Sequence, residues 1–149
     1  MHDFIINGTR NQKLIDFIES VYYQLGLNQY EDCLFELDFL PKCAGGAGGY
    51  CDGDDEYIQI EIARSDLQGR IRMDDLKINI AHEMIHAQQI ASGRLINKGF
   101  VLVEDPIRGN KFMAAKQIWE GKEYVGCKYD EQPWEKEAYS LEKKVALAL

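Results

Sequence analysis

The strongest chemical signal in this 149-residue chain is the run His82-Glu83-Met84-Ile85-His86. Two histidines four positions apart stand on one face of a helix, about one turn apart, so both imidazoles can reach the same ion. The glutamate between them can address a water bound to that ion. This spacing predicts a zinc site in which His82 and His86 are ligands and Glu83 is a general base.

The segment that carries these residues, Asp74 to about Ser92, has the apolar period of a helix and is followed by Gly93, a favoured residue just past a helix end. Its apolar positions are Leu76, Ile80, Met84, Ala87 and Ala91. At helical spacing they cluster on the side opposite the two histidines. We therefore expect a helix that buries one stripe in the core and aims both histidines outward.

A third ligand must come from elsewhere, because a catalytic zinc normally takes three protein ligands and leaves a fourth position for water. The chain has 3 histidines, and the remaining one, His2, lies next to the N-terminus, where chains are usually poorly ordered. A carboxylate is therefore favoured. The segment that follows Pro133 offers Glu135, Glu137 and Glu142.

Helical phase divides these glutamates between two borders of the helix that Pro133 is expected to open. The predicted buried stripe is Trp134, Ala138, Leu141, Val145 and Ala148. Glu135, Tyr139 and Glu142 follow one border, and Glu137 lies across the stripe near Lys144. Phase alone does not choose between the borders, and we favour the one where Glu135 has a tyrosine neighbour over the one where Lys144 would neutralise Glu137. We therefore expect Glu135 to be the third ligand and Glu137 to be a solvated charge, with Glu142 either supporting the site or solvated. Attraction to the helix dipole is the alternative explanation of Glu135.

Other segments predict the scaffold of a single domain over residues 1–149. The pattern from Asn11 to Leu25, before Gly26, is that of an amphipathic helix. Residues 33–39 and 57–62 alternate apolar with more polar residues, which predicts two strands that pair in one sheet. Within 112–125, a β-hairpin is expected to turn at Glu120-Gly121.

The glycine-rich segment 43–55 lacks the features of a phosphate-binding loop and the alternating acids of an EF-hand. We expect a flexible loop that borders the site. Four cysteines, Cys33, Cys43, Cys51 and Cys127, show no CxxC spacing, so we expect thiols. A structural zinc site built from all four is the alternative.

The charge balance restricts the possible partners. With 17 Lys and Arg against 25 Asp and Glu, the net charge is −8, which disfavours nucleic acid and anionic membranes as main partners. No apolar run approaches the roughly 18 to 20 residues of a membrane span, and the start of the chain lacks a signal-peptide pattern. We expect a cytoplasmic protein.

Two segments resemble zincin-type metallopeptidases. The small HExxH proteins that the chain resembles are of the SprT-like kind and the compact phage or ImmA/IrrE-like kind. Ile80-Ala81-His82-Glu83-Met84-Ile85-His86-Ala87 resembles the active-site helix of SprT-like proteins, and Pro133-Trp134-Glu135-Lys136-Glu137-Ala138 resembles the downstream helix of glutamate-ligand zincins. The resemblance implies an α+β, zincin-like fold: a small, mostly antiparallel sheet packed against the active-site helix, an N-terminal scaffold helix and a C-terminal helix bearing the ligand. It also implies that an edge strand, here Tyr57 to Ala63, holds an extended peptide. SprT-like proteins use a third histidine ligand, and many glutamate-ligand zincins have aspartate where this chain has Tyr139.

The predicted function is that of a zinc-dependent hydrolase, specifically a metallopeptidase acting on a peptide or protein. Glu83 would take a proton from water held by His82, His86 and Glu135 through Zn²⁺. Donors to the developing oxyanion are sought among Tyr50, Tyr124, Tyr129 and Tyr139. The alternative is a non-catalytic, zinc-stabilised binding or regulatory protein of the same fold. The −8 charge speaks against an SprT-like protease recruited to nucleic acid.

Overall fold

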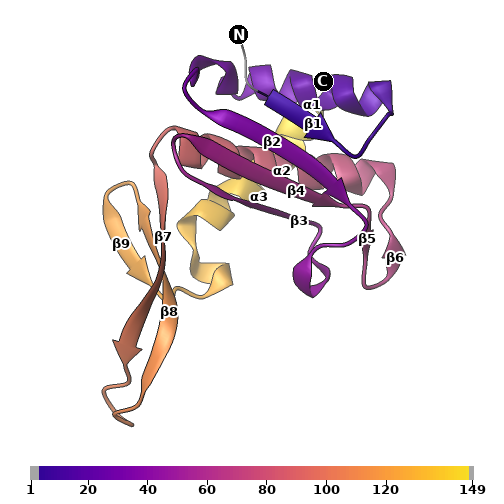
Figure 1. Ribbon diagram of the computed structural model, residues 1–149. Coiled ribbons are helices and arrows are strands. Elements are labelled where there is room, and N and C mark those ends of the chain that lie inside the picture. The colour runs from indigo at the N-terminus through magenta and orange to yellow at the C-terminus, as the bar shows by residue number, and fades with distance from the viewer. Residues whose placement is uncertain (1–3, 148–149) are drawn as a thin grey trace.

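The computed structural model describes residues 4–147 (Figure 1). The helices are α1 (Gln12–Gln24), α2 (Met73–Ala91) and α3 (Pro133–Leu147), with short 3₁₀ turns at Leu27–Gln29, Ala44–Gly46 and Tyr129–Glu131. The strands are β1 (Phe4–Asn7), β2 (Leu34–Leu40), β3 (Gly49–Gly53), β4 (Tyr57–Ala63), β5 (Ser65–Asp66), β6 (Gly69–Arg70), β7 (Leu95–Glu104), β8 (Lys111–Trp119) and β9 (Lys122–Val125). The three predicted helices are confirmed. His2 and Ala148 lie outside the described residues.

The main sheet has the strand order β1-β2-β4-β3. The predicted pairing of the strands at residues 33–39 and 57–62 is therefore confirmed, in β2 and β4. Two predictions are wrong. β1 and β4 both pair with β2 in parallel, and only β3 is antiparallel to its neighbour, so this sheet is not mostly antiparallel. The crossover through α1 returns the chain in the same direction, which allows parallel pairing. The strand Tyr57–Ala63 is interior, and the edge next to it is β3.

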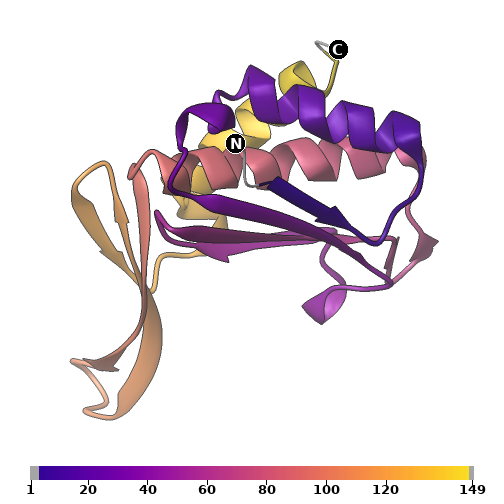
Figure 2. The same ribbon diagram turned by 45° about the horizontal axis from the view of Figure 1, so that its top comes forward.

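Helices α1 and α2 cover one face of this sheet (Figure 2). Alternating residues of the two central strands point into that core: Phe35 and Leu37 from β2, and Ile58, Ile60 and Ile62 from β4, all fully buried. Ile18 of α1 and both Ile80 and Met84 of α2 meet them there. At about 25 cal/mol per Å² of apolar surface, this burial is the main force that fixes α2 against the sheet.

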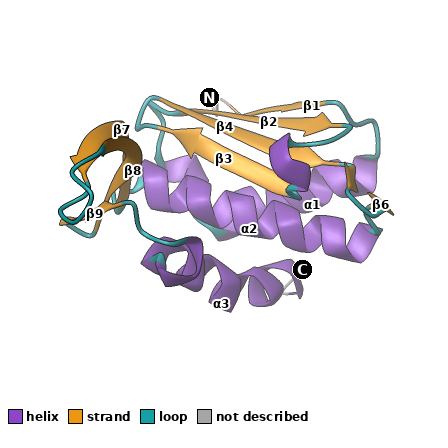
Figure 3. Cartoon of the chain, turned by 90° about the horizontal axis from the view of Figure 1, so that it is seen from below, coloured by secondary structure: helices purple, strands orange, loops and turns teal. Residues whose placement is uncertain are grey.

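Helix α3 packs against α2 on the side away from the sheet, so α2 lies between two layers (Figure 3). Trp134, Ala138 and Val145 of α3 are buried, and Leu141 is half-buried, which confirms the described part of the predicted stripe. Because α3 covers the histidine face of α2, His82 and His86 are buried rather than aimed outward, at 7% and 6% exposure.

A second, antiparallel sheet has the order β7-β8-β9. The predicted hairpin is confirmed between β8 and β9: Glu120 and Gly121 both have positive φ, 49° and 86°, as a two-residue turn that follows the strand twist requires. The long β7 strand was not predicted. The β7–β8 hairpin projects away from the main sheet (Figure 1).

Between residues 4 and 147, no helix combines the length and the apolar character needed to cross a membrane.

Candidate metal centre

Three side chains from two helices converge at one point. The Nε2 atoms of His82 and His86 are 3.2 Å apart. One Glu135 oxygen lies 2.9 Å from the His82 Nε2 atom, and the other lies 2.8 Å from the His86 Nε2 atom. The potential ligand atoms of these three residues, which we call the metal group, all lie within 4.8 Å of one another. In the described part of the chain, no other group of three or more His, Cys, Asp or Glu side chains could hold a metal ion in this way.

The convergence follows from helical spacing. His82 and His86 are one turn apart on α2, and Glu135, Tyr139 and Glu142 lie at i, i+4 and i+7 on α3, which places them on one face. All three α3 residues contact His82, two through carboxylates and Tyr139 through a ring contact of 4.6 Å between centroids. Helix α3 therefore presents the predicted border to α2.

The second nitrogen of each imidazole also has a partner. Nδ1 of His82 lies 2.8 Å from Glu142, and Nδ1 of His86 lies 2.8 Å from Oε1 of Gln89. Such partners fix the orientation of a ligating histidine and leave its Nε2 free for the metal. Glu142 therefore supports the site and is not a solvated charge.

Sequence reasoning did not identify Gln89, although its place three positions after His86, on the same side of the helix, is a usable signal. Its side chain is fully buried, and its Nε2 donates to the Trp134 carbonyl at 3.0 Å and to Glu137 at 3.2 Å. With these contacts the amide oxygen is held toward His86. Gln89 thus joins the site to the start of α3.

The acid–base properties of the site follow from burial and from these contacts. Burial alone raises the pKa of Glu135, but hydrogen bonds from His82 and His86 outweigh it and lower the pKa to about 2. Burial lowers the pKa of His82, but Glu135, Glu83 and Glu142 outweigh it and the net shift is upward. The pocket therefore favours an ionised Glu135 carboxylate facing the two imidazoles. The ionised form is the one in which a carboxylate binds a metal ion.

Glu83 lies beside this group at 8% exposure, and burial raises its pKa. The edge strand β3 passes directly over it at Gly49. A Cβ atom at that position would stand 2.7 Å from Cγ of Glu83 and 3.0 Å from the Glu61 carbonyl oxygen. Glycine is therefore required for β3 to lie against Glu83, and the glycine-rich segment that predicted a loop is partly a strand.

The site opens into a cavity of about 490 Å³. The metal group and Glu83 form one wall, and the others are formed by β3, from Gly49 to Asp52, and by Asn97, Phe100, Ala115 and Gln117 of the β7–β8 hairpin. Asn97 donates to Asp52 at 2.7 Å, which ties the hairpin to the edge strand.

Of the four tyrosines considered as oxyanion donors, Tyr50 and Tyr129 line the cavity. The Tyr129 hydroxyl donates to Glu135 at 3.0 Å and lies 2.9 Å from the Tyr139 hydroxyl. Tyr124 packs edge-on against Trp134 instead. Tyr129 is thus the cavity tyrosine in direct contact with the metal group.

The prediction that Glu137 is a solvated charge near Lys144 is wrong. Glu137 is paired with Arg94, whose Nη1 donates to it at 2.9 Å, and its side chain is 24% exposed. Arg94 also bonds Glu120 and lies 4.7 Å from the Trp119 ring centroid. Arg94 follows the end of α2, so this pairing comes from tertiary contact and not from helical phase on α3.

We expect Arg94→Met to lower the free energy of unfolding by about 1 to 2 kcal/mol, because it leaves a partly buried carboxylate without its charged donor. Lys116→Met is the matched control. The Lys116–Glu123 pair is longer, at 3.4 Å, and its glutamate is 65% exposed. Urea unfolding of both variants checks this, and equal losses would contradict it.

The same pair predicts a pH dependence of stability. Burial raises the pKa of Glu137, but Arg94 and Gln89 outweigh it and the net pKa lies below the ordinary 4.5. A lowered folded pKa contributes stability that is present above the unfolded pKa and lost as pH falls through the folded one. The stability difference between wild type and Glu137→Gln should therefore be largest above about pH 4.5 and shrink below it. Urea unfolding at several pH values measures it, and a difference that grows in acid would contradict the assignment.

The cysteines do not form a metal site. Cys33, Cys43, Cys51 and Cys127 are free, and among residues 4–147 none of them belongs to a group that could hold an ion. The alternative of a four-cysteine zinc site is therefore excluded. Cys51 lines the cavity, where burial and then the nearby Glu83 raise the pKa of its thiol.

Comparisons with protein-family models, with curated proteins and with solved structures found no match for this chain.

Proposed function

We propose that this chain is a zinc-dependent hydrolase that cleaves peptide bonds. The observation that carries the proposal is the convergence of His82, His86 and Glu135 next to a buried Glu83, at the wall of a cavity of about 490 Å³. A site with a purely structural role would not need an additional buried carboxylate facing the cavity.

The donor set suits zinc. Two imidazole nitrogens and one carboxylate are the ligands of a known class of catalytic zinc sites, which leave a fourth position for water. The partners on the two Nδ1 atoms, Glu142 and Gln89, hold the imidazoles in the tautomer that presents Nε2. The residues present therefore fit a zinc ion.

When bound, zinc would supply Lewis acidity and lower the pKa of a water toward about 7. Glu83 would accept the proton of that water and deliver it to the leaving nitrogen of the peptide bond. Its raised pKa is suited to a group that must take up a proton and give it away again. Tyr129 would donate to the developing oxyanion, since its hydroxyl already lies in the cavity beside Glu135.

The arrangement of the cavity supports an extended peptide as substrate. Strand β3 is the edge of the main sheet, so the outer side of its backbone is available to pair with another chain. The same strand lies against Glu83 at Gly49. A peptide paired with β3 would run past the proposed general base.

The cytoplasmic location stays a prediction.

Zinc analysis of purified variants tests the ligand set. We expect one zinc per chain in wild type and loss of the metal in His82→Ala and in His86→Ala, because each change removes one of three ligands. His2→Ala is the control and should keep the metal. Circular dichroism should show that the histidine variants remain folded. Full zinc content in both folded site variants would refute the proposed centre.

A further inference from the structure

The β7–β8 hairpin carries an exposed apolar strip formed by Phe100, Leu102 and Met113. Their exposed fractions are 71%, 61% and 59%. Leu102 and Met113 are directly paired across the two strands, and Phe100 is paired with Ala115. Directly paired residues share one face of a sheet, so the three side chains form a continuous surface.

A β-bulge decides which way this strip faces. From Asn97 to Phe100, β7 advances three residues, whereas β8 advances two, from Gln117 to Ala115. The extra residue brings Phe100 to the same face as Asn97, although regular alternation would place them on opposite faces. Gly99, with a φ of 76°, supplies the left-handed conformation that such a bulge uses.

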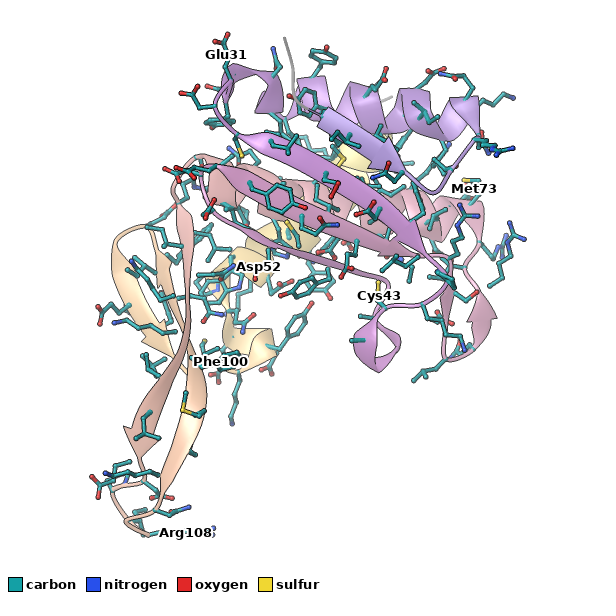
Figure 4. The ribbon with its side chains drawn as sticks, viewed as in Figure 1. Glu31, Cys43, Asp52, Met73, Phe100 and Arg108 are labelled. Atoms are coloured by element: carbon teal, nitrogen blue, oxygen red, sulfur yellow. The ribbon has the colours of Figure 1, made fainter. Side chains whose placement is uncertain are left out.

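The strip is therefore a continuation of the cavity wall. Asn97, Phe100, Ala115 and Gln117 all line the cavity that contains the metal group. Leu102 and Met113 are the next pair along the same face, away from the site. Figure 4 shows Phe100 part of the way along the hairpin, between Asp52 of β3 and Arg108 at the far tip.

We propose that this strip is an extension of the substrate cleft that binds alternate apolar side chains of an extended polypeptide, at positions removed from the scissile bond. The proposal rests on the proposed function. It defines the substrate class as extended chains with apolar residues at every second position, the kind exposed by unfolded or unstructured protein segments.

Two features favour an extended polypeptide as the ligand of this strip. Phe100 and Leu102 are two residues apart on a strand, about 6.6 to 6.8 Å, which matches the spacing of side chains on one side of an extended peptide. β7 is also an edge strand, so its outer backbone groups are available for pairing beside the strip. Exposed apolar side chains that continue the wall of a cavity are placed to contact apolar groups of a ligand bound there.

Peptide binding to the Glu83→Gln protein tests the proposal without turnover. The probes are two short fluorescently labelled peptides, one alternating leucine with threonine and one alternating glutamine with threonine. In fluorescence anisotropy, the leucine peptide should bind at least about tenfold more tightly, since each buried apolar side chain contributes more than enough for that factor.

Phe100→Ser combined with Leu102→Ser should weaken binding of the leucine peptide by at least about tenfold. Phe112→Ser is the matched control, because Phe112 pairs with Val103 on the opposite face of the same hairpin and is 47% exposed. It should leave the affinity unchanged. All three side chains are surface-exposed, so these changes should not unfold the core.

The outcomes separate this proposal from the proposed function. If the wild-type enzyme cleaves peptides but the leucine peptide binds no better than the glutamine peptide, or the double variant binds normally, the apolar strip is not a substrate site and the hydrolase proposal stands. If the leucine peptide binds through the strip but wild type cleaves nothing, the strip stands and the hydrolase proposal fails. If sedimentation shows a dimer that Phe100→Ser dissociates, the strip is an interface between two copies and the proposal is overturned.

Discussion

Replacing Glu83 with glutamine should lower the rate of peptide hydrolysis by about 10²- to 10⁴-fold while zinc stays bound. The amide keeps the size of the side chain in its buried place beside Gly49, but it cannot accept a proton. The substitution changes none of the proposed ligand atoms and none of their hydrogen-bond partners. The measurement is single-turnover cleavage of a peptide library, together with zinc content.

Glu61→Gln is the control for this result, because Glu61 is on β4 between the buried Ile60 and Ile62, so its side chain lies on the side of the sheet opposite the core. It should cleave as fast as wild type. Unchanged cleavage by Glu83→Gln would show that Glu83 is not the general base. If wild type binds zinc but cleaves no peptide, the alternative of a non-catalytic, zinc-stabilised binding protein replaces the hydrolase.

Glu135→Ala should weaken zinc binding by more than about 100-fold. Residues that hydrogen-bond to a metal ligand without binding the metal themselves contribute up to about 100-fold, and loss of a ligand should exceed that. Among residues 4–147, the substitution removes the one carboxylate that lies within 3 Å of both Nε2 atoms. Glu142→Gln and Gln89→Leu each disturb the orientation of one imidazole, and should cost about 10- to 100-fold.

Glu137→Ala should cost less than any of these, because Glu137 contacts Gln89 and Arg94 but neither imidazole. A competition titration with a chromophoric zinc chelator ranks the variants. A larger loss for Glu137→Ala than for Glu135→Ala would show that the other border of α3 supplies the ligand.

The parts of the site that lie on one helix were predictable from the sequence. The i, i+4 spacing of His82 and His86 and the shared face of Glu135 and Tyr139 depend only on helix geometry. Periodicity also identified the strands with clear alternation, such as β4. It could not show that β4 is interior, because strand order depends on contacts between distant segments.

The incorrect predictions also have their cause in contacts between segments that are distant in the sequence. The glycines of β3 have low strand propensity, so the sequence predicts a loop there, and the need for Gly49 arises only from its contact with Glu83. Helical phase predicts a solvated Glu137, because its partner, Arg94, is 43 residues away along the chain. The Gly99 bulge, which turns Phe100 toward the cavity, leaves no periodic pattern to detect.

The position of Glu135 near the start of α3 has a consequence for local stability. On the proposed ligand set, the ion joins α2, which is fixed in the core, to a helix of 15 residues that packs mainly on α2. By mass action, an ion that binds both helices stabilises only conformations in which α3 is docked. Metal occupancy and docking of α3 are then one coupled equilibrium. Chelation should therefore speed amide hydrogen exchange first in α3, while the amides of α2 and of the central strands stay protected.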